Sequence, residues 1–269
     1  MEKLLVESGF KIFGLEISYY GLIIAVGIGL GIFIAIKNAE KRGLKGDDII
    51  TLALYAIPLA VLGARIYYCL FFDDTFSFVE FFKIWEGGMA IYGAVIGGAV
   101  GAVLFCLIHK KNFLAVADVA CISLILGQGL GRIGCYFAGC CYGVEVTNPV
   151  FMWFPFAVEM SGVWHYSTFF YESFFNLIIF GVLFFLFRKK VNTTGVIFSL
   201  YILCYGVVRC IIETFRGDSL YIFNVIKVSQ LLSAILIVVG IIMLVIIYTK
   251  KKKGVSNEEN SPTKSDTNN

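Results

Sequence analysis

Seven apolar stretches of about 20 residues constrain the fold of this chain more than any other feature. They are Ile17–Ile36, Ile49–Phe71, Gly87–Ile108, Val116–Gly134, Thr168–Phe187, Gly195–Ile212 and Val228–Tyr248. Each is long enough to cross the hydrocarbon core of a bilayer as a helix, and lipid cannot satisfy the open edges of strands. We therefore predict an all-α, polytopic membrane protein with about seven transmembrane helices.

The composition supports this class and excludes two others. Apolar residues make up 59% of the chain and charged residues 15%, whereas soluble domains hold roughly 45–50% and 25%. A soluble protein needs more surface charge to stay dispersed, and disordered chains are poor in aromatic and branched residues. The net charge of +3 says little about partners, and no nucleic-acid partner is expected.

Basic residues cluster at alternate ends of the apolar stretches. They follow the first, third, fifth and seventh stretches, at Lys37–Lys45, Lys110–Lys111, Arg188–Lys190 and Lys250–Lys253. The opposite ends hold fewer cations, namely Lys3, Lys11, Lys83, Arg216 and Lys227. Because loops rich in Lys and Arg stay in the cytoplasm, we predict an external amino terminus and a cytoplasmic carboxyl terminus.

The chain divides into three parts on this interpretation. Residues 1–16 form an external segment, residues 17–249 form the seven-helix transmembrane domain, and residues 250–269 form a basic and then disordered cytoplasmic tail. The polar composition from Gly254 onward is the reason for expecting disorder there. The second half of the membrane region does not resemble the first, which weakens an inverted-repeat transporter interpretation.

Glycines recur at a spacing of four within several of the predicted helices. This spacing places them on one helix face, where small residues let the backbones of two helices approach closely. The positions are Gly27 and Gly31, then Gly93, Gly97 and Gly101, then Gly127 and Gly131. We expect tight helix packing at most of these positions.

Charged side chains inside the apolar stretches gather near their predicted external ends. An arginine at mid-membrane costs roughly 2.5–3.5 kcal/mol, so such a residue usually has a partner or a function. The set comprises Arg65, Arg132, Arg209, Glu172 and Glu213, with Tyr20 and Tyr92 at the same depth. Asp118 is the exception, because it lies near the cytoplasmic end of its stretch. We therefore expect a polar site that opens toward the outer leaflet.

Simpler explanations stay open for single members of this set. A boundary arginine is often a snorkelling anchor or an ion-pair partner. Arg209 and Glu213 are four residues apart on one helix face and could neutralise each other. Taken together, the arginines favour a phosphate ligand, which guanidinium groups bind in a bidentate fork. A lipid headgroup is the phosphate available at this depth.

The glycine-rich segment Gly127–Gly143 contains Arg132 and invites comparison with a phosphate loop. That interpretation is rejected, because no strand precedes the segment and the Gly-Lys-Ser/Thr ending is missing. A glycine-rich helix end beside an arginine still permits close approach of a headgroup to the backbone.

Six segments, in order along the chain, resemble the prolipoprotein diacylglyceryl transferase family. They are Tyr19–Gly21, Glu86–Gly93, Gly127–Gly143, Thr168–Glu172, Tyr205–Asp218 and Ser229–Ser233. The third contains the Gly-Arg-x-Gly hallmark of the family, and the fifth fits its Tyr-Gly, Arg, Glu, Arg pattern. The resemblance covers nearly all of the membrane region, and a related subgroup shares the Gly-Cys-Cys-Tyr-Gly run at Gly139–Gly143.

The resemblance implies a multi-pass enzyme of the bacterial cytoplasmic membrane, with its active site toward the outer leaflet. It would transfer a diacylglyceryl group from phosphatidylglycerol to the lipobox cysteine of prolipoproteins, the first step of lipoprotein maturation. The implied partners are phosphatidylglycerol, prolipoprotein signal peptides with a lipobox cysteine, and membrane lipid. No cofactor and no metal are implied.

The resemblance also assigns roles to individual residues. Arg132 and Arg209 would hold the phosphate and stabilise negative charge as the carbon–oxygen bond breaks. Tyr92 is the third catalytic candidate and occupies the position where many family members carry His. The substrate-binding candidates are Tyr20, Gly143, Glu172, Tyr205, Glu213 and Arg216.

The chain departs from the family pattern next to its hallmark. Cys135, Ala138 and Cys140 stand where the family commonly has Asn, Asn and Glu. A divergent member acting on another phospholipid or acceptor therefore stays open, as does a lipid or anion transporter. A retinal-type receptor is excluded, because Val228–Tyr248 contains no lysine.

Three cysteines, Cys135, Cys140 and Cys141, fall in this altered segment. Nearby thiols could bind a soft metal, form a disulfide or accept an acyl group. The segment has no Cys-x-x-Cys pair and no adjacent His, so we expect small packing residues rather than a metal site.

Overall fold

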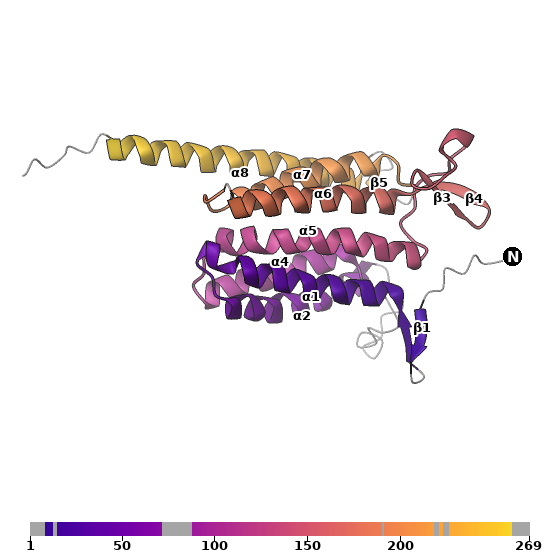
Figure 1. Ribbon diagram of the computed structural model, residues 1–269, viewed down its shortest axis with the longest axis horizontal. Helices are drawn as coiled ribbons and strands as arrows, with labels where there is room; N and C mark the ends of the chain where they lie inside the picture. The colour runs from indigo at the N-terminus through magenta and orange to yellow at the C-terminus, as the bar shows by residue number, and fades with distance from the viewer. Residues whose placement is uncertain are drawn as a thin grey trace, which may run out of the picture. The chain divides into compact units, whose positions relative to one another are not determined.

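The computed structural model describes residues 9–12, 15–71, 88–189, 191–217, 221–222 and 226–259. Long helices dominate these ranges (Figure 1). They are α1 (Tyr19–Ala39), α2 (Gly46–Phe71), α4 (Ile91–Ile108), α5 (Phe113–Phe137), α6 (Thr168–Lys189), α7 (Val196–Glu213) and α8 (Val228–Glu259). In the described part of the chain, seven helices are long and apolar enough to cross a membrane. The predicted fold class is confirmed.

The observed helices follow the predicted apolar stretches closely at most of their ends. The third is shorter at its start, because α4 begins at Ile91 and Gly87 lies outside the described residues. The last is longer, because α8 continues to Glu259, into the segment for which we predicted disorder. Residues 260–269, the rest of that predicted tail, lie outside the described residues, as do residues 1–8.

Within the described residues, three antiparallel hairpins accompany the helices, and the apolar stretches gave no sign of them. They pair β1 (Gly9–Ile12) with β2 (Leu15–Ser18), β3 (Ala157–Met160) with β4 (Val163–Tyr166), and β5 (Tyr221–Ile222) with β6 (Ile226–Lys227). Short 3-10 turns lie at η1 (Glu40–Arg42) and η3 (Pro149–Phe151). The second strand of every hairpin leads into a helix, which is α1, α6 or α8.

The chain divides into two compact units, one of residues 5–138 and the other formed mainly by residues 139–269. In the first unit, α2 packs on α4 and α1 packs on α5. In the second, α7 packs on both α6 and α8, and Figure 1 shows these three helices in orange to yellow, running side by side.

Glycines make the contact between α2 and α4 possible, as their spacing predicts. A Cβ added at Gly93 would lie 2.1 Å from the carbonyl oxygen of Gly63, and one at Gly97 would lie 2.0 Å from that of Leu59. Nothing larger than hydrogen fits at such distances, so the two backbones touch directly. The contact of α1 with α5 is looser at Gly31, where the Ser123 hydroxyl donates a 2.6 Å hydrogen bond to the Gly31 carbonyl.

We expect Gly97→Ala to lower the stability of the protein, because the added methyl group forces α2 away from α4. Overpacking of this kind costs about 1–3 kcal/mol. Thermal unfolding of the purified protein in detergent measures the effect. Gly29→Ala is the matched control, since a Cβ at Gly29 meets nothing within 4 Å. Equal unfolding temperatures for the two variants would contradict the account of this packing.

Asp118, the one charged residue predicted near the cytoplasmic end of its apolar stretch, takes part in a buried ion pair. The Arg42 Nε donates a 2.9 Å hydrogen bond to the Asp118 carboxylate, and both side chains are almost completely buried. The pair joins the segment after α1 to the first part of α5. Asp118 therefore has a structural role at the end of the bundle that we predict to be cytoplasmic.

Candidate active site

In the second unit, one arginine lies between two buried carboxylates. Arg209 on α7 donates a 2.9 Å hydrogen bond from Nη1 to Glu172 on α6, and its Nη2 forms an ion pair with Glu213 on α7, also at 2.9 Å. The side chains are 15%, 3% and 1% exposed for Arg209, Glu172 and Glu213. The i, i+4 spacing predicted the pair with Glu213. The pair with Glu172 ties α6 to α7 and fixes the plane of the guanidinium.

The charge of this group has a chemical consequence. The guanidinium of Arg209 faces two carboxylates, so Arg209 by itself does not create a positive site. Further cations favour the binding of a phosphate there. Arg216 follows three residues after Glu213 and is half-buried, which makes it the nearest candidate along the chain.

Lys227 closes the end of α7, a role that its position in the sequence did not reveal. Its ammonium donates hydrogen bonds of 2.8 Å to the Glu213 carbonyl and 2.9 Å to the Arg216 carbonyl. Cations are favourable at helix carboxyl ends, where carbonyls lack helical partners. The lysine thus holds the backbone that carries Glu213 and Arg216.

Gly143 lies at a crowded position in the same unit. A Cβ there would lie 2.6 Å from the Phe215 carbonyl oxygen and 2.9 Å from the Thr168 methyl. The Gly143 amide donates to the Tyr166 carbonyl at 2.8 Å, and its carbonyl lies 3.1 Å from His165 Nδ1. The chain after α5 is therefore fixed against both β4 and the end of α7. Close backbone packing explains the glycine.

The start of α6 is held to this segment by a side chain as well. The Thr168 hydroxyl donates a 2.7 Å hydrogen bond to the Cys141 carbonyl. His165 also packs its ring on Tyr142, with centroids 4.8 Å apart. The structure thus places His165 beside Gly143.

In the first unit, Tyr20 and Arg132 belong to neighbouring parts of one helix pair. Tyr20 opens α1, and its ring covers Gly134 on α5, where a Cβ would lie 2.9 Å from the ring. Arg132 is half-buried and precedes Gly134 by two residues. The Gly-Arg-x-Gly hallmark is thus the stretch of α5 on which Tyr20 rests.

Arg65 and Tyr92, also in the first unit, have other surroundings. Arg65 is buried, donates a 2.9 Å hydrogen bond to the Gly88 carbonyl and lies 5.7 Å from the Tyr68 ring. It therefore supports the backbone before α4, where Gly88 has a positive φ of 71°. Tyr92 is the second residue of α4, and its ring centroid lies 6.1 Å from that of Tyr67.

The structure therefore brings some of the predicted site residues into direct contact with one another. It brings together Arg209, Glu172 and Glu213, with Tyr205 one turn earlier on α7 and stacked on Tyr201 at 6.0 Å. Tyr20 lies beside the hallmark that contains Arg132. The motif residues Glu86, Gly87 and Asp218 lie outside the described residues.

Comparison with known proteins gives the family. The model of the prolipoprotein diacylglyceryl transferase family matches residues 8–246 of this chain. The chain belongs to this family. It is a multi-pass membrane protein, as its helices require.

Relatives within the diacylglyceryl transferase family match over nearly their whole length. The phosphatidylglycerol–prolipoprotein diacylglyceryl transferase of Oceanobacillus iheyensis is 39% identical over 240 residues, which cover 85% of this chain and 83% of the relative. A transferase of the same name, numbered 1, from Clostridium perfringens is 37% identical over 91% of this chain and 97% of its own length. The Finegoldia magna transferase is 36% identical, over 87% and 92%.

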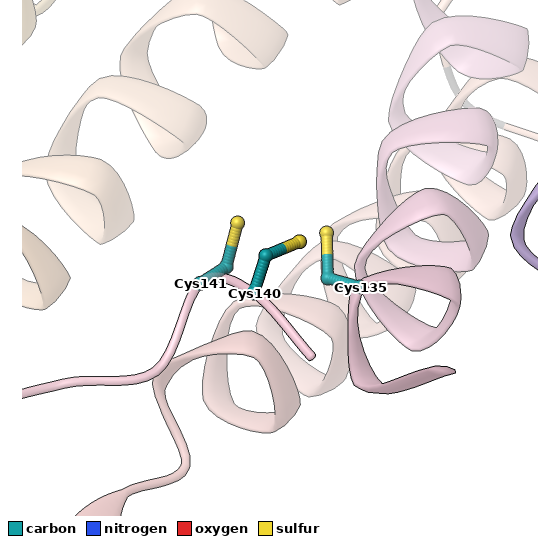
Figure 2. Close-up of side chains that lie close together, drawn as sticks. All are labelled: Cys135, Cys140 and Cys141. Carbon is teal, nitrogen blue, oxygen red and sulfur yellow. The ribbon is translucent and has the colours of Figure 1, made fainter. Parts of the chain in front are cut away.

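Three thiols lie close together at the end of α5 and in the residues that follow it (Figure 2). Cys135 is in the last turns of α5, Cys140 and Cys141 follow it, and the three sulfur atoms lie within 4.8 Å of one another. Cys135 is buried, Cys141 is half-buried and Cys140 is exposed, and a packing role for the three stays a prediction. Three thiols so close are one ligand short of a four-coordinate zinc site.

Proposed function

We propose that this protein transfers the diacylglyceryl group of phosphatidylglycerol to the lipobox cysteine of prolipoproteins. The observation that carries the proposal is the family match over residues 8–246, within which Arg209 is held by two buried carboxylates. The names of the relatives from three organisms agree with it.

The proposed reaction is a substitution at a glycerol carbon. The thiolate sulfur of the acceptor cysteine forms a bond to the terminal glycerol carbon of the diacylglyceryl group. The bond between that carbon and the phosphate oxygen breaks, and glycerol phosphate leaves with the bonding electrons. The thiol must first lose its proton, because the thiolate is the nucleophile.

Within this proposal, arginines stabilise the leaving phosphate. Arg132 and Arg209 each donate hydrogen bonds to phosphate oxygens on which negative charge increases as the bond breaks. Arg216 adds positive charge beside Glu213. The two carboxylates that face Arg209 support a need for more than one arginine.

The remaining site residues have supporting roles in the proposal. Tyr92 is the candidate proton acceptor, and its phenolate form takes the proton of the substrate thiol. Glu172 and Glu213 orient Arg209. Tyr20 and Tyr205 contact the glycerol hydroxyls of the headgroup, and Gly143 contributes to the substrate site by keeping its segment packed against Thr168 and Phe215.

We also propose the orientation that the basic clusters predict, with the amino terminus outside the cytoplasmic membrane and the site toward the outer leaflet. All three hairpins then precede helices that run inward. This orientation suits an acceptor that is exported before it is modified.

A transfer assay tests the proposed function. Purified protein is mixed with phosphatidylglycerol micelles and a lipobox peptide, and mass spectrometry measures the peptide. We expect the mass of the peptide to increase by one diacylglyceryl group, and a peptide with Ser in place of the lipobox Cys to stay unmodified. If the peptide stays unmodified while a known transferase modifies it, the proposed reaction is rejected.

A further inference from the structure

Asn176 on α6 is a buried amide with unmet hydrogen-bonding capacity. Its side chain is 0% exposed, and within the described residues neither its amide nitrogen nor its oxygen has a hydrogen-bond partner. An unpaired amide is costly to bury, above all in a membrane helix, where water is scarce. Such a residue calls for a polar group that completes its hydrogen bonds.

The place of Asn176 on α6 relates it to Arg209. It follows Glu172 by four residues, so the two lie on the same helix face, with buried Ser173 beside them. Four residues advance a helix by about 6 Å. Asn176 therefore lies one turn further from the start of α6 than the carboxylate that holds Arg209.

The antiparallel neighbour of α6 has a site residue at the same level. Glu172 on α6 and Arg209 on α7 lie at the same level, and the two helices run in opposite directions. Asn176, four residues after Glu172, is therefore level with Tyr205, four residues before Arg209. The buried polar face of α6 thus extends past the arginine, toward the acyl region of a bound lipid.

We infer that Asn176 forms an acyl-ester subsite, in which its amide N–H donates to an ester carbonyl oxygen of the phospholipid donor. The inference rests on the proposed function. In a diacyl phospholipid the ester carbonyls follow the phosphate by one glycerol unit, toward the membrane centre. They are acceptors only, and a neutral amide donor suits them at a depth where a charged donor is expensive.

The test compares a diester phosphatidylglycerol with its diether analogue, which keeps the headgroup and the reacting carbon but has no carbonyls. The rate of transfer to a lipobox peptide gives kcat/KM for each lipid in detergent micelles at equal mole fraction. We expect the wild type to favour the diester by about two- to tenfold, the range of one neutral hydrogen bond. We expect Asn176→Leu to lose this preference through slower use of the diester.

Asn38 on α1 offers a matched control in the first unit. It is also 0% exposed, and neither of its amide atoms has a hydrogen-bond partner within the described residues. Asn38→Leu should keep the diester preference of the wild type. Equal use of both lipids by the wild type, or an unchanged preference in Asn176→Leu, would overturn the subsite. Asn176 would then form its hydrogen bonds with a buried water.

A second measurement tests the subsite even when a variant folds poorly or the protein shows no transfer activity. Thermal stabilisation of the wild type by each lipid reports binding without transfer, and the diester should stabilise more. Equal stabilisation would overturn the subsite. Absence of transfer from either lipid, with diester-selective stabilisation, would reject the proposed function and leave the ester contact supported. Asn176→Ser, a smaller change, repeats the comparison if Asn176→Leu does not fold.

Discussion

Arg209→Ala should abolish diacylglyceryl transfer and destabilise the protein at the same time. The guanidinium contacts Glu172 and Glu213 at 2.9 Å, and the substitution removes this cation from two buried carboxylates. Removing one partner of a buried pair costs about 3–5 kcal/mol. Loss of a group that stabilises charge in the transition state lowers kcat by about 10²–10³.

The two effects can be separated with Arg209→Lys. Lysine keeps the positive charge between the carboxylates but lacks the planar fork that binds a phosphate through two hydrogen bonds. We expect an unfolding temperature near that of the wild type and a transfer rate lower by about tenfold or more, as for loss of one charge-assisted hydrogen bond. Thermal unfolding and initial transfer rates measure the two quantities. A lysine variant with the full rate would show that Arg209 only balances charge.

Arg132→Ala should remove transfer with little loss of stability. Arg132 lies near the end of α5, whereas Arg209 forms ion pairs with two buried carboxylates, so we expect the smaller loss of stability at Arg132. Its proposed contact with the leaving phosphate predicts a loss of about 10²–10³ in rate. The measurement is kcat/KM for phosphatidylglycerol, together with thermal unfolding.

Arg188→Ala is the control for Arg132, because Arg188 lies in the last turn of α6, at the opposite end of that helix from Glu172. There it packs on the Phe184 ring at 5.4 Å. It should keep the wild-type rate. Wild-type transfer by Arg132→Ala would contradict the proposal that this arginine binds the phosphate.

The helices were predictable because a membrane span is a local property of the sequence. Length and hydropathy set the ends of α2, α6 and α7 to within a few residues. The hairpins depend on a weaker signal. Ser161 and Gly162 link β3 to β4 with positive φ angles of 54° and 82°, the geometry of a tight two-residue turn. A Ser-Gly pair between short apolar runs could have indicated this turn.

Contacts of the site within one helix could be predicted from the sequence, whereas contacts between separate elements could not. Spacing on one helix predicted the Arg209–Glu213 pair. The contact of Glu172 with Arg209, the support of Gly88 by Arg65 and the closure of α7 by Lys227 join residues from separate elements. Nothing in the spacing of these residues indicates which carbonyl or carboxylate each cation meets. The predicted depth in the membrane grouped these polar residues together but did not indicate which of them pair with each other.

The packing of α1 on α5 has a consequence for biogenesis. The hydrogen bond from Ser123 to Gly31 joins residues 92 positions apart, and Arg42 bonds to Asp118 across 76. At a synthesis rate of about 5–20 residues per second, α1 leaves the ribosome roughly 5–20 s before its partner. Both α2 and α4 are synthesised within that interval. The first helix is therefore synthesised well before α5, its partner, and Arg42 has no Asp118 to pair with until α5 is made.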